Sequence, residues 1–184
     1  MESIIYIVLT VLLIVILVII AKYNKLVKLF NKMKKAKSDI EICLNKRFDL
    51  MPNLVETVKG YAKHEENTFK EVIEARNKMN TASNINEELE ASNAITGALN
   101  KLFALSEAYP ELKSNENFLS LQKDLKETED KLSYARQFYN DSVLMYNNTR
   151  EKFPSNIVAN IFGFKEINFF KASEKEKEVP NVKF

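Results

Sequence analysis

The chain has 184 residues, and its 27 Lys and Arg side chains nearly balance its 25 Asp and Glu side chains. So small a net charge gives no global attraction to nucleic acid, and a single cysteine, Cys43, excludes an internal disulfide framework and fits a reducing compartment. Three glycines and four prolines leave little turn chemistry, which favours long helices.

The N-terminal stretch from Ile4 to Ile20 has fifteen Ile, Leu or Val residues among its seventeen and carries no charge. With Ala21, a helix over 4–21 spans roughly 27 Å, which just crosses a hydrocarbon core of about 30 Å. A cleaved signal peptide needs a basic leader and a small-residue cleavage site, whereas Met1-Glu2-Ser3 precedes this stretch and Lys22-Tyr23 follows it. The sequence therefore predicts a transmembrane helix over 4–21, with residues 1–3 outside the cytoplasm.

A lysine-rich stretch without acidic residues follows the predicted membrane helix. Its members are Lys22, Lys25, Lys28, Lys32, Lys34, Lys35 and Lys37. Basic residues stay on the cytoplasmic side, so we expect an outside N-terminus and a cytoplasmic body. The lysines are also candidate contacts for anionic lipid headgroups, which predicts salt-sensitive binding of the cytoplasmic segment to anionic vesicles. The simpler interpretation, a topology signal on a solvated face, is compatible with that role.

The next part of the chain predicts helices interrupted at few places. Neither Gly nor Pro occurs from Ile4 to Met51, so the membrane helix is expected to continue into an amphipathic helix. Pro52 either kinks or ends it, and a kink is favoured because no loop-forming residues accompany the proline. An apolar helical stripe then continues to Met79, with a weak point around Gly60 and residues 63–66.

Three further elements are expected. After a polar loop at 80–86, Asn84 and Glu87 form a candidate capping box for a shorter helix that ends at Tyr109-Pro110. A long helix starts at Ser114 or Asn115 and stops before Pro154, followed by a short apolar element at 156–164 and a charged tail. The long helix has a heptad seam with one apolar row and one small or polar row, which suits a bundle; the rows are Phe118, Leu125, Leu132, Tyr139 and Tyr146, and Leu121, Thr128, Ala135, Ser142 and Thr149.

Candidate catalytic chemistry is sparse. His64-Glu65 is half of an HExxH zinc signature, but position 68 is Thr, and one His with one Cys gives no ordinary protein-only zinc site. Cys43 lies on the apolar stripe without a nearby His to activate it, so a packed thiol is expected. We predict no catalytic residue, metal, cofactor or small-molecule substrate.

Several motifs resemble the LemA family of bacterial membrane-anchored helical proteins. The longest is the block Arg47–Tyr61, RFDLMPNLVETVKGY, and it carries most of the specificity. The others are Tyr23-Asn24, Leu26-Val27, His64-Glu65, Ala75-Arg76, Tyr109-Pro110, Leu112-Lys113, Ala135-Arg136, Tyr139-Asn140, Tyr146-Asn147, Phe153-Pro154, Ala159 and Phe164. One departure is Lys37, at a position where the family pattern leads us to expect Trp.

The resemblance implies an all-α fold: a single N-terminal transmembrane helix, then an antiparallel bundle of three to four long helices over 22–165 and a short tail over 166–184. It implies the bacterial cytoplasmic membrane as location and supplies no established reaction. Six polar residues embedded in the motifs are candidates for a structural polar network or a partner site: Arg47, Asp49, Asn53, Arg136, Asn140 and Asn147. Asn140 and Asn147 are seven residues apart and share a helix face, which favours the structural role.

Two functional hypotheses follow. The first is a non-enzymatic, membrane-anchored scaffold whose partners are the bilayer, its anionic headgroups and other proteins, but not nucleic acid. The alternative is an unrecognised enzyme or metal-dependent regulator, or an accessory subunit of a membrane protease or transporter. A pocket with clustered ionisable groups favours the enzyme, whereas a smooth bundle with an exposed apolar groove favours the scaffold.

Overall fold

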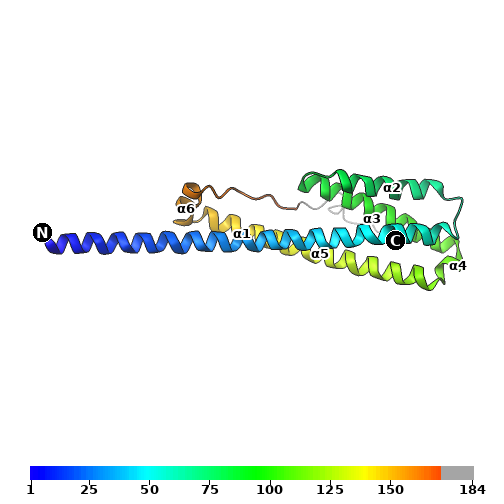
Figure 1. The fold of residues 1–184 in the computed structure, drawn as a ribbon, viewed down its shortest axis with the longest axis horizontal. Coiled ribbons are helices and arrows are strands. Elements are labelled where there is room, and N and C mark those ends of the chain that lie inside the picture. Colours follow the sequence, from blue (N-terminus) through cyan, green and yellow to red (C-terminus); the bar gives the residue numbers. More distant parts are fainter. Residues whose placement is uncertain (171–184) are drawn as a thin grey trace, which may run out of the picture. The chain divides into compact units, whose positions relative to one another are not determined.

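A computed structural model describes residues 1–170, apart from the side chains of residues 85 and 86. Helices account for 86% of the described residues, and no strand occurs among them, so the predicted all-α class with an N-terminal apolar helix and a bundle is confirmed. The helices are α1 (Glu2–Lys59), α2 (Glu66–Thr81), α3 (Ile85–Ala108), α4 (Pro110–Lys113), α5 (Glu116–Glu151) and α6 (Ser155–Phe162), shown in Figure 1. The predicted tail lies outside the described residues from position 171 onward.

The described chain forms two compact units. Unit 1 contains residues 1–39 and 135–169, and unit 2 contains residues 40–134 and Phe170. The long helices α1 and α5 each contribute one part to each unit. The predicted boundaries at 21/22 and 165/166 stay predictions.

The helix α1 continues through Pro52 and ends only at Lys59. Of the two alternatives predicted for Pro52, a kink or an end of the helix, the end is therefore wrong. The predicted weak point after Gly60 is instead a complete break, which corrects the expected continuous stripe. Met51 and Leu54 on either side of the exposed Pro52 are fully buried, and this packing holds the helix together. At the break, the Val58 carbonyl accepts from the amides of both Tyr61 (3.0 Å) and Ala62 (2.9 Å), closing a turn.

The core of unit 2 is built from α1, α2, α3, α4 and α5, and α4 contributes Leu112. The chain contributes Met51 and Val58 from α1, Val72 from α2, Leu102 from α3 and Leu125 from α5, all nearly inaccessible to solvent. Figure 1 shows α2 beside α3, and these helices pack against one another. This core brings buried positions of α1, α3 and α5 within side-chain reach of one another.

The start of α3 is fixed by its own side chains. The Asn84 Oδ1 atom accepts from the Glu87 amide at 3.1 Å. The Glu87 carboxylate accepts from the Ser83 amide (2.7 Å) and hydroxyl (2.8 Å). The predicted cap at Asn84 is thus present, with the return bond of Glu87 one residue earlier than a standard capping box.

The core of unit 1 is smaller. Leu26 of α1, Tyr146 of α5 and Val158 and Ala159 of α6 are buried together, and Ile19 packs against them. The α6 helix ends at Phe162 and is capped by Gly163, whose φ of 73° is left-handed and therefore favours glycine. All five residues of the predicted apolar heptad row on α5 are buried across the two units.

Candidate functional site

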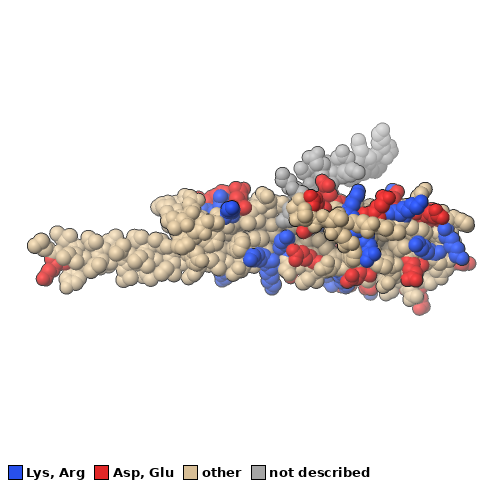
Figure 2. All heavy atoms as spheres, turned by 45° about the horizontal axis from the view of Figure 1, so that its top comes forward, with Lys and Arg blue, Asp and Glu red and all other residues tan. Residues whose placement is uncertain are grey.

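The first part of α1 is an exposed apolar rod. Every side chain from Met1 to Val18 is exposed, and none of the apolar window is buried. By length and composition, α1 is the one helix among the described residues that could cross a membrane. Figure 2 shows this segment without charge except near its tip. An apolar helix in the core of a soluble protein would be buried, whereas this helix exposes its whole apolar window.

The seven lysines follow the apolar rod on the same uninterrupted helix. All are exposed or half-buried. Two rest on aromatic rings: Lys32 Nζ lies 5.0 Å from the Phe138 ring centroid, and Lys34 Nζ lies 5.2 Å from that of Phe30. Unit 1 as a whole has eleven basic and five acidic side chains. A positive field therefore surrounds the point where the apolar surface ends.

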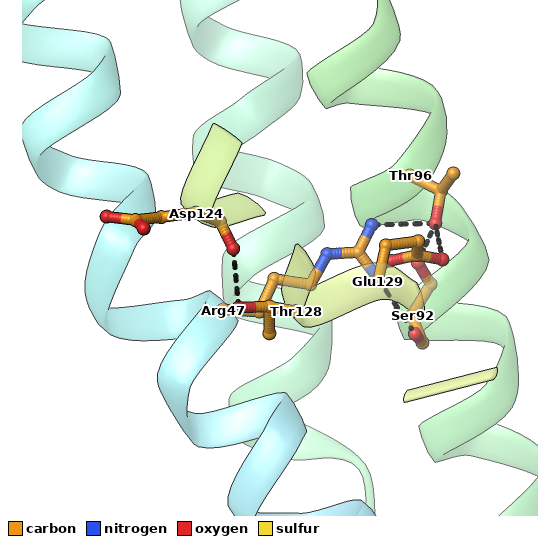
Figure 3. A network of polar contacts seen from close by, with 6 residues as sticks. All are labelled: Arg47, Ser92, Thr96, Asp124, Thr128 and Glu129. Carbon is orange, nitrogen blue, oxygen red and sulfur yellow. Dashed lines mark hydrogen bonds and ion pairs between the residues drawn. The ribbon is translucent and has the colours of Figure 1, made fainter. Parts of the chain in front are cut away.

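Arg47 is the centre of a buried polar site in unit 2 (Figure 3), with only 2% of its surface exposed. Its guanidinium donates to the Thr96 hydroxyl at 2.7 Å and to the Ser92 hydroxyl at 3.4 Å. It also lies 2.7 Å from a carboxylate oxygen of Glu129. These contacts join α1, α3 and α5 through one charged side chain.

A cavity of about 250 Å³ adjoins this site. Arg47, Thr96 and Glu129 form part of its wall, and the other polar lining residues are Asn100, Gln122, Lys126 and Asp130. Because Arg47 and Glu129 face one another, the two charges neutralise each other. The Thr96 hydroxyl is also within 3.5 Å of a Glu129 carboxylate oxygen. The arrangement can hold a small polar molecule by hydrogen bonds.

A second polar site in unit 1 holds the extended chain after α6. The Asn147 side chain donates from Nδ2 to the Ile167 carbonyl at 2.9 Å, and its Oδ1 atom accepts from the Ile167 backbone amide at 3.2 Å. The Tyr146 hydroxyl donates to the Lys165 carbonyl at 2.9 Å, and Arg150 Nε donates to the Phe164 carbonyl at 3.1 Å. Burial raises the pKa of Tyr146, which Arg150 partly opposes. The hydroxyl therefore remains a donor at neutral pH.

Sequence reasoning did not find this clamp, because its acceptors are backbone atoms. The detectable signal was the recurrence of hydrogen-bonding side chains on or beside the apolar row near the end of the long helix: Tyr139, Tyr146, Asn147 and Arg150. The hydroxyl of Tyr139 also reaches the chain after α6, donating to the Asn168 carbonyl at 3.2 Å.

The six predicted polar candidates fall in different units. Arg47, Asp49 and Asn53 belong to unit 2, where the last two are exposed. In unit 1, Asn147 is buried, whereas Arg136 and Asn140 are half-buried.

The residues weighed for metal and thiol chemistry lie apart. His64 is exposed and Cys43 is half-buried. Over residues 1–170, no group of three or more His, Cys, Asp or Glu side chains is arranged to hold a metal ion.

The fold and the exposed rod define an all-α protein with one N-terminal helix that could span a membrane. The family model of the LemA family matches residues 36–184, and the chain belongs to that family. The predicted family is therefore confirmed.

Curated relatives agree. The chain is 26% identical over 175 residues to magnetosome protein MamQ of Magnetospirillum gryphiswaldense, covering 81% of this chain and 64% of the relative. It is 27% identical over 181 residues to protein LemA of Metamycoplasma hominis, covering 95% and 80%. Magnetosome protein MamQ 2 of Paramagnetospirillum magneticum is 25% identical with the same coverage as the first. The chain thus spans less than two thirds of the MamQ relatives, and none of these names denotes an enzyme.

Proposed function

We propose that this LemA-family chain is a non-enzymatic, membrane-anchored interaction protein of the bacterial cell envelope. Residues 4–21 span the cytoplasmic membrane, the seven lysines bind anionic headgroups on the cytoplasmic side, and the helical bundle is a scaffold for other proteins. One observation carries this proposal: the exposed apolar rod and the lysine stretch are consecutive parts of a single helix.

Because α1 is continuous, each lysine lies at a fixed distance along the helix from the end of the apolar stretch. At about 1.5 Å per residue, Lys22 to Lys37 occupy roughly the first 25 Å beyond the apolar stretch. Those closest to the bilayer can extend their ammonium groups to phosphates while their methylene stems cover apolar surface. Each lysine near an anionic surface contributes about 1 kcal/mol of attraction, and this attraction decays within a Debye length.

The test uses the full-length protein in nanodiscs and measures the rate of lysine acetylation by mass spectrometry. The lysines nearest the apolar rod, Lys22, Lys25 and Lys28, should react at least threefold more slowly in anionic phosphatidylglycerol discs than in neutral phosphatidylcholine discs. At 0.5 M salt the difference should largely vanish, because screening weakens the headgroup contact.

Lys63, Lys70 and Lys78 are matched internal controls, because they are exposed in unit 2 of the same molecule. Their rates should not depend on the lipid. Equal protection of both lysine sets, or no protection of either, would remove the headgroup role while leaving the anchor open to a separate test.

The cavity beside Arg47 supports the second candidate function, a binding or catalytic role toward a small polar molecule, because ionisable groups cluster there. A metabolite screen monitored by the thermal unfolding of the intact protein tests it. A stabilising compound whose effect is lost in Lys126→Gln, a rim residue outside the Arg47 contacts, would favour this alternative.

For the scaffold role, crosslinking in native membranes followed by mass spectrometry should recover defined protein partners, including any protease or transporter.

A further inference from the structure

The α6 segment is an uncharged stretch within a highly charged chain. Lys152 and Lys165 flank twelve residues, Phe153 to Phe164, that include no Asp, Glu, Lys or Arg. Most are apolar, and α6 occupies the middle of the stretch. A segment this apolar needs burial on more than one side.

Among residues 1–170, protein covers only one side of α6. Ser155, Val158 and Ala159 are buried in unit 1. The opposite side leaves large apolar side chains exposed: Phe153 is 79%, Ile157 50% and Ile161 69% exposed. Phe162, at the end of the helix on the side of Val158, is also 53% exposed. Phe153, Ile157 and Ile161 are spaced four positions apart and therefore share one apolar face, which Phe162 adjoins at the end of the helix.

This face lies at the level where the anchor's apolar surface ends. The Phe162 and Phe164 rings lie 4.8 Å and 5.7 Å from the ring of Tyr23, centroid to centroid. Ile19 packs against the same cluster as Val158. Figure 1 shows α6 against this part of α1, and Figure 2 shows the uncharged surface continuing from the rod onto it.

Tyr23 is three residues, or about 4.5 Å, beyond Ile20, which places it at the membrane–water interface when the apolar stretch spans the bilayer. Aromatic side chains are enriched at that level. A short helix with apolar residues on its outer side and no charges can lie in the interface plane, with its exposed face among the acyl chains just below the headgroups.

We propose that α6, with Phe153, is a second membrane-contacting element, which inserts Phe153, Ile157, Ile161 and Phe162 into the cytoplasmic-side leaflet beside the anchor. The inference rests on the proposed membrane span of residues 4–21. The occupant is lipid rather than a second protein, because the face is continuous with the apolar surface of the anchor and lies at its level. Lys22 and Lys25 next to Tyr23 then meet the headgroups of the lipids that cover α6.

The test places a bimane label at Ile161→Cys or, separately, at Ile157→Cys in full-length Cys43→Ser protein reconstituted into vesicles. Two quenchers are compared: lipid carrying a doxyl group at carbon 5 of the acyl chain, and aqueous iodide. Both positions are exposed, so the labels should not disturb the fold, and circular dichroism checks this.

Two further label sites are matched controls. Leu12→Cys reports on the anchor itself. Leu144→Cys is an apolar α5 position with comparable exposure (48%), next to Met145, whose sulfur contacts Lys32 Nζ at 3.9 Å. It therefore lies at the level of Lys32, about 14 Å farther along α1 than Tyr23.

We expect doxyl lipid to quench the labels at 157 and 161 at least twofold more than the label at 144, and iodide to quench them at least twofold less. One outcome overturns the inference and leaves the anchor intact: doxyl lipid quenches the label at position 12, while iodide quenches the labels at 157 and 161 as strongly as the label at 144. Shielding of 157 and 161 from both quenchers also overturns it, since a protein then covers the face. If 12 is not quenched by lipid, the membrane span and this inference fail together.

Discussion

Arg47 shows how a single residue can join three helices. A guanidinium with 2% exposure loses nearly all of its hydration, and this loss is offset by the Glu129 carboxylate and by the hydroxyls of Ser92 and Thr96. Glu129 keeps 38% of its side-chain surface exposed, but its Oε2 atom, which faces Arg47, is buried. The pair therefore specifies how α1, α3 and α5 meet more than it adds net stability.

Arg47→Ala should lower the free energy of unfolding by about 2–4 kcal/mol, because it removes packing and leaves the hydroxyls and Glu129 without their donor. The double substitution Arg47→Met with Glu129→Gln should recover at least half of that loss, since it removes both charges and refills the volume. Urea unfolding of both variants checks this. A fully destabilised double variant would show that the ion pair itself is the main source of stability.

Two glycines in open space should respond oppositely to Ala. Gly97 lies inside α3, and Gly163 has a φ of 73°; a Cβ at either meets nothing within 4 Å. Gly97→Ala should stabilise by roughly 0.5–1 kcal/mol through helix propensity. Gly163→Ala should destabilise by about 1–2 kcal/mol through its left-handed conformation. Thermal unfolding of the two variants measures the difference, and shifts of the same sign would contradict the assignment.

At the scale of the element, the start of α3 depends on an ionised carboxylate. Hydrogen bonds from the amide and then the hydroxyl of Ser83 lower the pKa of Glu87. A lowered folded-state pKa means that the stabilisation is fully present above the ordinary glutamate value of about 4.3 and is lost as pH falls through the folded value.

The stability difference between the wild type and Glu87→Gln should therefore be largest at neutral pH and shrink as pH drops below about 4. Chemical denaturation from pH 7 to pH 3 measures it. Glu90→Gln is a matched control, since Glu90 is an exposed carboxylate one turn later on the same helix. A difference that grows toward acid pH would show that the ionised Glu87 carboxylate does not stabilise the start of α3.

Side chains of α5 hold the segment after α6 in place by hydrogen bonds to its backbone. Asn147→Ala removes both bonds to the Ile167 backbone, and we expect the Ile167 amide to lose at least tenfold of its protection against hydrogen exchange. The melting temperature should also fall, as expected for a structural asparagine. Asn148→Ala, at an exposed neighbouring position, is the control and should leave exchange at Ile167 unchanged.

At the scale of the whole molecule, we expect the lysines that follow the proposed membrane span to set its orientation in the bilayer. We expect a protease added outside intact cells to leave residues beyond 40 uncut, and the same protease to cut them in inside-out membrane vesicles. Neutralising the seven lysines to Gln should allow a fraction of the chains to insert in the reverse orientation. Cleavage of this region only from outside would reverse the proposed topology.

Much of the element structure could be predicted, because it depends on short-range patterns. The break before Pro110, the end of the long helix before Pro154 and the Asn84 cap each follow from the chemistry of adjacent residues. Adjacent residues could not show which of Pro52 and Gly60 ends the first helix. The buried neighbours of Pro52 keep it inside a helix. The exposed Gly60 lies at a turn that returns the chain to the core at Ala62.

The candidate sites divide in the same manner. The apolar rod and the lysines are readable from composition, since each acts through its own surface. The partners of Arg47 lie 45 to 82 residues away on two other helices, and those of Asn147 are backbone atoms of a segment without a motif.

By itself, the sequence determined the helical class, the family, the apolar segment long enough to cross a bilayer and the charge that follows it. Hydrophobic length, periodicity and net local charge are sums over neighbouring residues, and these sums do not depend on how the chain folds back. Only the tertiary structure decided that Arg47 pairs with Glu129, that α5 clamps the chain at Ile167, and that α6 presents an uncovered apolar face beside Tyr23. Each of these depends on which distant residues become neighbours, and long-range packing alone selects them.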